Sequence, residues 1–270
     1  MISCDHALVH RLERAEASAN AAFVEARARV EPAVGACWNE VAGAYAMFDG
    51  VGSPLTQTFG LGLEPVDDTA FAAVEAFFST RGASTSHEVA SSASDDVTRQ
   101  LPARGYTAIE HSTVWARATT ALDDRPPSSI AVRRVDADEF GLWARVSAQG
   151  WSDSGAELSA FVEQLGRIMA QARGVVCFVA ELDAQPIAAA ALNLGAGVAL
   201  LAGASTVPSA RGRGAQRALL DARLAYAAAQ GIDLAMMVTQ PEGASYRNAA
   251  RVGFQALYGR TKWERRVEAK

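Results

Sequence analysis

Cysteine is scarce in this sequence. Only three of the 270 residues are cysteines, Cys4, Cys37 and Cys177, and they are far apart with no CxxC pair. This odd, scattered set argues against a disulfide framework and against a zinc site. No N-terminal segment joins a basic start to a long apolar run, and no apolar run reaches the roughly 20 residues of a membrane helix. We therefore expect a cytoplasmic protein with no membrane partner.

Histidine is scarce as well, and all four histidines lie in the first half of the chain. His6 and His10 have the i, i+4 spacing of a zinc-binding helix, but Ala7 stands where a zinc protease has its glutamate, so we predict no metal. The second half lacks the histidine of a Ser-His-Asp hydrolase. The formal net charge is −5, and there is no basic field to attract nucleic acid as a partner.

Hydrophobic residues, in contrast, make up half of the chain. The chain can bury a substantial core, and its length allows one large domain or two of ordinary size. Residues 119–129, TTALDDRPPSS, have the composition of a linker, with paired prolines and paired aspartates. We expect a first domain over residues 1–118, a linker over 119–129 and a second domain over 130–270.

The two halves end in similar segments. RGYTAIEHSTVWAR (104–117) and VGFQALYGRTKWER (252–265) align without gaps at an offset of 148 residues. The matched pairs are Gly105/Gly253, Tyr106/Phe254, Ala108/Ala256, Ile109/Leu257, Thr113/Thr261, Trp115/Trp263 and Arg117/Arg265. A coincidence between two strand starts would explain one or two of these pairs, whereas the whole run favours an internal duplication into tandem domains.

The second half alternates between strand and helix patterns. The expected strands are 129–135, 175–182, 186–194, 197–206, 232–239 and a last one from 254, and the expected helices are 137–149, 156–172, 214–229 and 243–251. Asp136 and Glu139 have the spacing of a capping box, which gives them a structural role. An antiparallel meander that runs into a βαβ crossover predicts an α/β fold with a mixed sheet.

One strand-to-helix junction, Arg211-Gly212-Arg213-Gly214, has the composition of an anion site. A helix N-terminus leaves backbone N–H groups unpaired, glycines allow a phosphate to approach them, and arginines add positive charge. The alternative is a plain basic loop. The sequence has no GxxxxGK[ST] nucleotide loop, and a third glycine of a dinucleotide fingerprint is missing here.

This layout resembles the GNAT N-acetyltransferase superfamily, whose acyl-CoA loop reads [Q/R]-x-x-G-x-[G/A] between a strand and a helix. Arg211 and Gly214 match, Gln216 stands where a small residue is usual, and Thr206-Val207-Pro208 matches the lead-in. The resemblance covers about residues 129–266 and implies the GNAT fold in a tandem arrangement, with acetyl-CoA as co-substrate. It also implies a set of residues that bind acetyl-CoA: Thr206, Val207, Arg211, Gly212, Arg213, Gly214, Ala215, Gln216 and Asn248.

Acetyl transfer to an amine needs a neutral amine, a polarised thioester carbonyl and a proton for the leaving thiolate. The resemblance implies that a backbone N–H of the strand before the loop polarises the carbonyl. That strand, GVALLAGASTV, contains no carboxylate base, and Ala249 occupies the position of the usual tyrosine acid. Tyr246 and Tyr258 are the remaining candidates for the acid, with ordinary packing as the alternative for each.

The substrate wall of GNAT proteins comes from the first two helices and their connection, here residues 147–159. Asp153 and Glu157 are expected to attract a cationic amine there, Trp151 to stack on it and Ser205 to lie beside it. The alternative is a solvated loop with one buried tryptophan.

In the first half, EPVDD (64–68) stands where the second half has its basic loop, and its acids would cap a helix but repel pyrophosphate. We expect a degenerate GNAT-like domain with an opening helix over about 5–33. The predicted function is acetyl transfer from acetyl-CoA to a primary amine of a small molecule or peptide. The alternative is a catalytically inactive acyl-CoA-binding or sensing protein. A homodimer is left open.

Overall fold

The computed structural model describes residues 2–119 and 129–266. The chain divides into two compact units: unit 1 comprises Met1–Arg117 and Met236–Lys270, and unit 2 comprises Ala118–Ala235. Most of the predicted linker, residues 120–128, lies outside the described residues. The last 35 residues belong to the same compact unit as the first half, and the predicted domains 1–118 and 130–270 stay a prediction.

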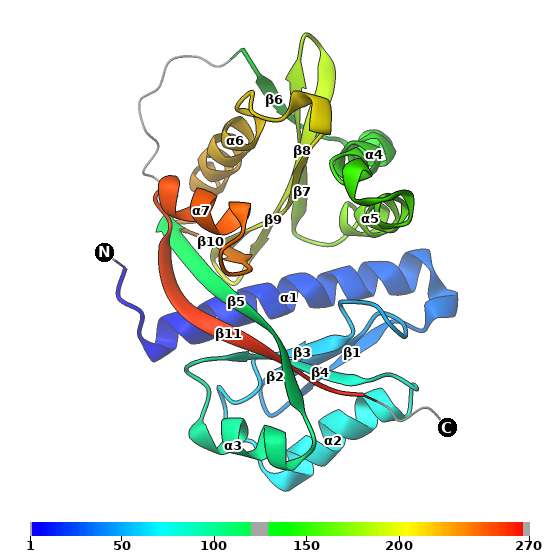
Figure 1. Cartoon of the computed structure of the whole chain (residues 1–270), viewed down its shortest axis with the longest axis vertical. Helices are drawn as coiled ribbons and strands as arrows, with labels where there is room; N and C mark the ends of the chain where they lie inside the picture. The colour runs from blue at the N-terminus through cyan, green and yellow to red at the C-terminus, as the bar shows by residue number, and fades with distance from the viewer. Residues whose placement is uncertain (1, 120–128, 267–270) are drawn as a thin grey trace. The chain divides into compact units, whose positions relative to one another are not determined.

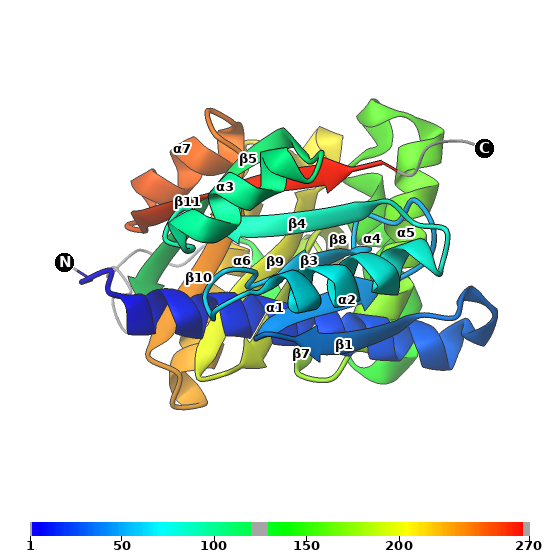
Figure 2. The same ribbon diagram turned by 90° about the horizontal axis from the view of Figure 1, so that it is seen from below.

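Unit 1 is built on a sheet with the strand order β1-β2-β3-β4-β11-β5. Neighbouring strands are antiparallel, except β3 and β4, which are parallel. Helix α1 covers one face, and α2 and α3 cover the other (Figures 1 and 2). The elements are α1 (His6–Val30), β1 (Cys37–Val41), β2 (Ala44–Phe48), β3 (Gln57–Phe59), α2 (Asp68–Ser79), β4 (Thr85–Ala90), α3 (Asp95–Ala103), β5 (Thr107–Ala118), α7 (Ala244–Arg251) and β11 (Gln255–Arg265).

Side-chain alternation on β2 explains this layering. Tyr45 and Met47 pack with α1, whereas Ala46 and Phe48 pack with α2. Successive side chains of a strand point to opposite faces, so a strand that is buried throughout has to be covered on both sides. The helix starts are fixed locally: Asp67 accepts a hydrogen bond from the backbone N–H of Ala70 at 2.8 Å, which confirms its predicted role as a cap.

Unit 2 has an antiparallel sheet in the order β6-β7-β8-β9. Helices α4 and α5 cover one face and α6 covers the other (Figure 1). Strand β10 (Leu234–Thr239) leads from this unit into unit 1. The remaining elements are β6 (Ala131–Arg134), α4 (Phe140–Gln149), α5 (Ala156–Met169), β7 (Val175–Leu182), β8 (Gln185–Gly195), β9 (Val198–Thr206) and α6 (Ala215–Ala229).

The predicted capping box before α4 is wrong in part. The Asp136 side chain makes no capping hydrogen bond, and residues 137–139 form a 3-10 turn ahead of the helix. Glu139 forms an ion pair with Arg133, at 2.6 Å from Nη1 to Oε2, and this contact lowers the pKa of Glu139. A backbone hydrogen bond with Asp136 also lowers the pKa of Glu139, so the half of the capping box that Glu139 supplies is present. Both acids remain structural, as predicted.

The two similar segments pair with each other. Strands β5 and β11 are antiparallel neighbours in unit 1, and Ser112 lies opposite Arg260. These two positions are themselves 148 residues apart, so the pairing has a local two-fold symmetry centred on them. Each strand also carries one extra residue, Ile109 in β5 and Leu257 in β11, and these form another matched pair. Symmetric pairing with symmetric bulges supports an internal duplication.

None of the helices within residues 2–119 and 129–266 combines the length and the hydrophobicity that a bilayer crossing requires.

Candidate anion-binding site

The candidate site in unit 2 begins at a β-bulge in β9. Ala189 of β8 lies opposite Ser205, and Ala191 lies opposite Ala202, so Gly203 and Ala204 stand against a single residue of β8. Gly203 has φ of +57°, a value that strongly favours glycine. The bulge releases two residues of β9 from regular pairing with β8 a few residues before the predicted loop.

Arg223 of α6 forms hydrogen bonds with carbonyl groups beside this bulge. Its Nη1 atom donates to the carbonyl oxygens of Ala191 at 3.0 Å and Ala202 at 3.4 Å, and its Nε atom donates to Leu219 at 3.1 Å. The side chain is buried, and burial lowers the pKa of the guanidinium to about 10, so it stays charged at neutral pH. Sequence reasoning missed this residue, because an arginine on the apolar face of a helix carries no local signal of what it contacts.

The connection between β9 and α6, residues 207–214, carries the two glycines of the predicted motif. Gly212 has φ of +79° and Gly214 has φ of +93°. A Cβ on either residue would meet no atom within 4 Å, so the positive φ angles, and not crowding, require glycine here. Gly214 is the N-cap of α6 and turns the chain into the helix.

Five consecutive backbone N–H groups, those of residues 212–216, have no hydrogen-bond partner among the described residues. They precede and open a helix of 15 residues, whose dipole places partial positive charge at the same end. No side chain caps this terminus. Unpaired amides around two glycines at a helix N-terminus have the chemistry of an anion-binding concavity, so this turn is the candidate site.

The two arginines of the loop differ in their surroundings. Arg211 forms an ion pair with Asp153, at 2.6 Å from Nη1 to Oδ2, and its Nη2 atom donates to the carbonyl oxygen of Gly150 at 2.8 Å. The Arg211 guanidinium lowers the pKa of the Asp153 carboxyl. Arg213 is exposed and makes no ion pair or hydrogen bond within the described part of the chain. Arg213 is therefore the arginine that is free to meet an anion.

Gln216, the departure from the motif, also contacts β9. Its Nε2 atom donates to the Thr206 hydroxyl at 2.9 Å. Val207 continues the pairing of β9, because its N–H donates to the carbonyl oxygen of Ile187 at 2.9 Å. Ala215 is buried beneath the first turn of α6. The long side chain of Gln216 thus leaves its own backbone N–H open and fixes the helix start to the strand.

The end of α4 packs closely against β9. The Ser205 hydroxyl donates to the carbonyl oxygen of Ser147 at 2.8 Å. A Cβ on Gly150 would lie 2.5 Å from the Ser205 Cβ, so only glycine allows this approach. Sequence reasoning missed both Ser147 and Gly150. Of the other predicted substrate residues in this unit, Trp151 and Glu157 are exposed.

The remaining predicted residues belong to unit 1. The Tyr246 ring makes an edge contact with Trp115, 4.7 Å between centroids, and its hydroxyl has no hydrogen-bond partner among residues 2–119 and 129–266. The Tyr258 hydroxyl donates to Glu13 Oε1 at 2.7 Å, and burial raises the pKa of this tyrosine. Asn248 is exposed and accepts a hydrogen bond from Arg251 at 2.5 Å. The catalytic, cofactor-binding and substrate-binding roles expected of these residues and of those in unit 2 stay predictions.

Comparison with known families matches the central part of the chain. Residues 110–243 match the family model described as an acetyltransferase (GNAT) domain. No curated protein sequence matches the chain.

Solved structures resemble almost the whole chain. A GCN5-related N-acetyltransferase from Kribbella flavida is 20% identical with a TM-score of 0.61, and the match covers 90% of this chain and 95% of that one. A tandem GNAT protein from the clavulanic acid biosynthesis pathway is 15% identical with a TM-score of 0.61, covering 85% and 80%. A GCN5-related N-acetyltransferase from Sphaerobacter thermophilus is 18% identical with a TM-score of 0.53, covering 77% and 71%. These likenesses concern the fold, and they confirm the predicted mixed-sheet α/β class.

Proposed function

We propose that the chain transfers an acetyl group from acetyl-CoA to a primary amine of a small molecule or peptide, because residues 110–243 match the model of an acetyltransferase (GNAT) domain. The observation that carries this proposal is the row of five open backbone amides at residues 212–216, ahead of α6. A pyrophosphate presents several acceptor oxygens with negative charge, which is the complement of this concavity. Arg213 adds an exposed positive charge beside it.

The bulge in β9 is the proposed place where the thioester carbonyl of acetyl-CoA is polarised. Acetyl-CoA supplies the activated acetyl group as a thioester. We assign to a backbone N–H of the bulged segment at Gly203 and Ala204 the role of donor to the thioester oxygen, because this segment departs from regular pairing with β8. Thr206 and Val207 continue the same strand edge toward the loop and are assigned to the pantetheine arm.

Tyr246 is the better candidate for the acid that protonates the leaving thiolate. Its hydroxyl is uncommitted among the described residues, whereas the hydroxyl of Tyr258 is held by Glu13. Strand β9 contains no carboxylate, so we assign removal of the proton from the substrate ammonium to water. The amine nitrogen then attacks the carbonyl carbon and the C–S bond breaks. The thiolate takes a proton from the Tyr246 hydroxyl, and the proton that the new amide nitrogen gives up returns through water to Tyr246.

The first test is binding of acetyl-CoA, followed as a rise in melting temperature. We expect wild-type protein to be stabilised, Arg213→Glu to lose most of the rise, and Arg145→Glu, which changes an exposed arginine on α4, to keep it. Arg211 is a poor target, because its loss also breaks the ion pair with Asp153. An unchanged melting temperature of the wild-type protein would contradict the proposed role of the loop.

The second test follows release of the CoA thiol with a panel of amines. Turnover with any amine supports the transferase and contradicts the inactive alternative. Stabilisation by acetyl-CoA without thiol release from any amine would instead favour the CoA-binding or sensing protein.

A further inference from the structure

Unit 1 contains a cavity of about 370 Å³ that none of the proposed roles uses. Its walls come from α1, β3, β4, β5, β11, the loop between β2 and β3, and the end of β10. A volume of this size lies in the range of small-molecule sites, roughly 300–1,000 Å³. The cavity is therefore large enough for a small metabolite.

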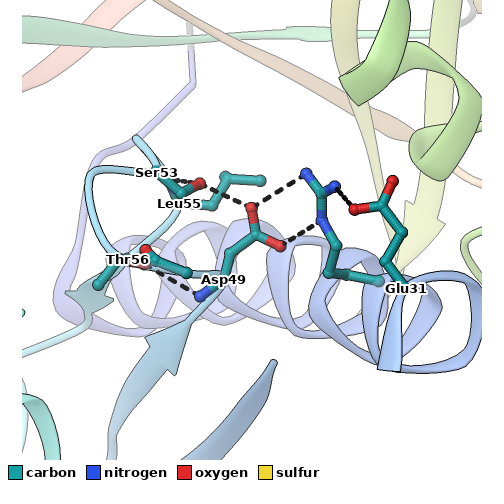
Figure 3. A network of polar contacts seen from close by, with 7 residues as sticks. Glu31, Asp49, Ser53, Leu55 and Thr56 are labelled. Carbon is teal, nitrogen blue, oxygen red and sulfur yellow. Dashed lines mark hydrogen bonds and ion pairs between the residues drawn. The ribbon is translucent and has the colours of Figure 1, made fainter. Parts of the chain in front are cut away.

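The loop that forms one wall is held firmly. Asp49 accepts hydrogen bonds from Arg27 at 2.9 Å and from the Ser53 hydroxyl at 2.6 Å, and its N–H donates to the Thr56 hydroxyl at 3.0 Å. Figure 3 shows Asp49 at the centre of this network, with Leu55 on the same loop. Leu55 lines the cavity, so the network fixes an apolar wall of the cavity in place.

Charged residues form the floor of the cavity in a regular pattern. On the adjacent strands β4, β11 and β5, Glu88, Lys262 and Glu110 lie opposite one another in one row. Arg260 and Ser112 face each other two residues further along, on the same side of the sheet. All five residues line the cavity. The centre of a sheet is normally apolar, so charged side chains on three adjacent strands suggest a functional role.

Several polar atoms in the lining have no partner. Arg260 is 2% exposed; its Nε and Nη1 atoms pair with Glu13 at 2.6 Å and Glu16 at 2.5 Å, but its Nη2 atom has no hydrogen-bond partner in the described part of the chain. The same holds for Oε1 of Gln57, which is 6% exposed, and for Oγ of Ser112. Buried polar atoms are normally satisfied. One unpaired cationic donor and two unpaired acceptors therefore belong to residues that line a single cavity.

Glu88 is the carboxylate best placed to take a cation. Its side chain makes no hydrogen bond with any described residue, and burial raises its pKa to about 7. The Lys262 side chain likewise makes no ion pair or hydrogen bond among the residues described. The lining holds three carboxylates, on Glu16, Glu88 and Glu110, against the two cations of Arg260 and Lys262, which favours a ligand with a positive charge. An ammonium group beside Glu88 would return its pKa toward the ordinary value.

We propose that this cavity binds a small zwitterion of the amino-acid class, with its ammonium group on Glu88 and Gln57 and its carboxylate on Arg260 and Lys262. Such a ligand supplies donors to the unpaired acceptors and an acceptor to the unpaired Nη2 atom. The apolar wall at Leu55 and Phe59 then receives the rest of the molecule. Binding at this cavity depends only on unit 1 and stands whether or not the loop of unit 2 binds acetyl-CoA.

Ligand-observed NMR with the standard amino acids tests the proposal. We expect at least one amino acid to bind the full-length protein, and its decarboxylated amine and its deaminated acid to bind roughly tenfold more weakly each, because each lacks one charged pair. If no amino acid binds, or if the amine alone binds as tightly as the amino acid, the proposal is wrong.

Variants locate the site. Glu88→Gln is expected to weaken binding roughly tenfold, whereas Asp96→Asn, an exposed carboxylate of α3 in the same unit, is expected to leave it unchanged. Arg213→Glu in unit 2 is expected to bind the amino acid normally, which separates this proposal from the proposed function. Circular dichroism spectra confirm that each variant is folded. Equal binding by wild type and Glu88→Gln would overturn the assignment.

Discussion

Arg117 donates a hydrogen bond from Nη1 to the carbonyl oxygen of Val252, at 2.5 Å. The matched residue Arg265 donates in the same way to the carbonyl oxygen of Arg104, which matches Val252, at 3.3 Å. Each guanidinium also lies over the aromatic ring that follows in the other segment, Arg117 over Phe254 and Arg265 over Tyr106. The two similar segments therefore exchange the same contacts, each holding the helix end of the other.

This exchange predicts unequal costs for two matched substitutions. Arg117→Ala should lower the free energy of unfolding by about 2 kcal/mol, because the carbonyl group of Val252 loses the charged donor of a buried arginine. Arg265→Ala should cost about 1 kcal/mol or less, since this side chain is more exposed and its hydrogen bond to Arg104 is longer. Urea denaturation of both variants measures the difference, and an Arg265→Ala variant that is the less stable of the two would contradict the reading.

A second prediction concerns the close approach of Gly150 to β9. Gly150→Ala places a Cβ 2.5 Å from Ser205 and 3.1 Å from the backbone nitrogen of Thr206, so the strand must shift. We expect acetyl-CoA binding to weaken roughly tenfold, since small displacements of binding groups have large effects. Adding Ser205→Gly removes the worst contact and should restore part of the affinity. Calorimetric titration of the single and double variants provides the measurement, and an unaffected single variant would show that β9 tolerates the shift.

A third prediction separates the two tyrosines. Tyr246→Phe should lower the rate of thiol release at least roughly tenfold with unchanged acetyl-CoA binding, as expected for loss of a general acid. Tyr258→Phe should instead lower stability by about 1–2 kcal/mol, because Glu13 loses a buried hydrogen-bond donor. Steady-state kinetics and urea denaturation of both variants give the comparison. The assignment of Tyr246 fails if Tyr246→Phe turns over normally.

A fourth prediction follows from Glu88, whose pKa of about 7 in the folded protein is raised above the ordinary value of 4.5 by burial. Lys262 and Arg260 on β11, Glu110 on β5 and Glu16 on α1 also act on it. The folded state then binds more protons than the unfolded state between these values, so the contribution of Glu88 to stability falls as the pH rises from about 4.5 to 7.

Replacing the carboxyl group removes this pH dependence. We expect the free energy of unfolding of Glu88→Gln, measured relative to wild type, to increase by roughly 2 kcal/mol when the pH is raised from 5 to 8. This value is discounted for the partial exposure of the side chain. Denaturation of both proteins at the two pH values tests the sign. A gain at pH 5 that vanishes at pH 8 would contradict the assignment of the shift to Glu88.

The sequence predicted those parts of the molecule whose signal is local. Helix α6, the meander β7 to β9 and the glycine loop have clear periodicity or turn residues, and each was expected within a few residues of its observed bounds. The hairpin of β1 and β2 and the short helix α3 received no prediction, and α3 contains Pro102. Strand β3 is limited to Gln57–Phe59, because Gly60 and Gly62 take positive φ angles.

Long-range contacts account for what the sequence did not predict. The role of Arg223 depends on two carbonyl groups at a bulge in another element, and that of Gly150 depends on how closely α4 approaches β9. The insertion of β11 between β4 and β5 depends on pairing between residues at least 139 positions apart in the chain. No local pattern encodes such a partner choice.

The position of β11 has a consequence for synthesis on the ribosome. Strands β4 and β5 emerge early, but the strand that separates them is translated only after all of unit 2. Until then each of these strands has an open edge that another chain can occupy. The sheet of unit 1 therefore cannot be completed before β11 is translated. A chain released by a ribosome that stalls within unit 2 would be prone to aggregation.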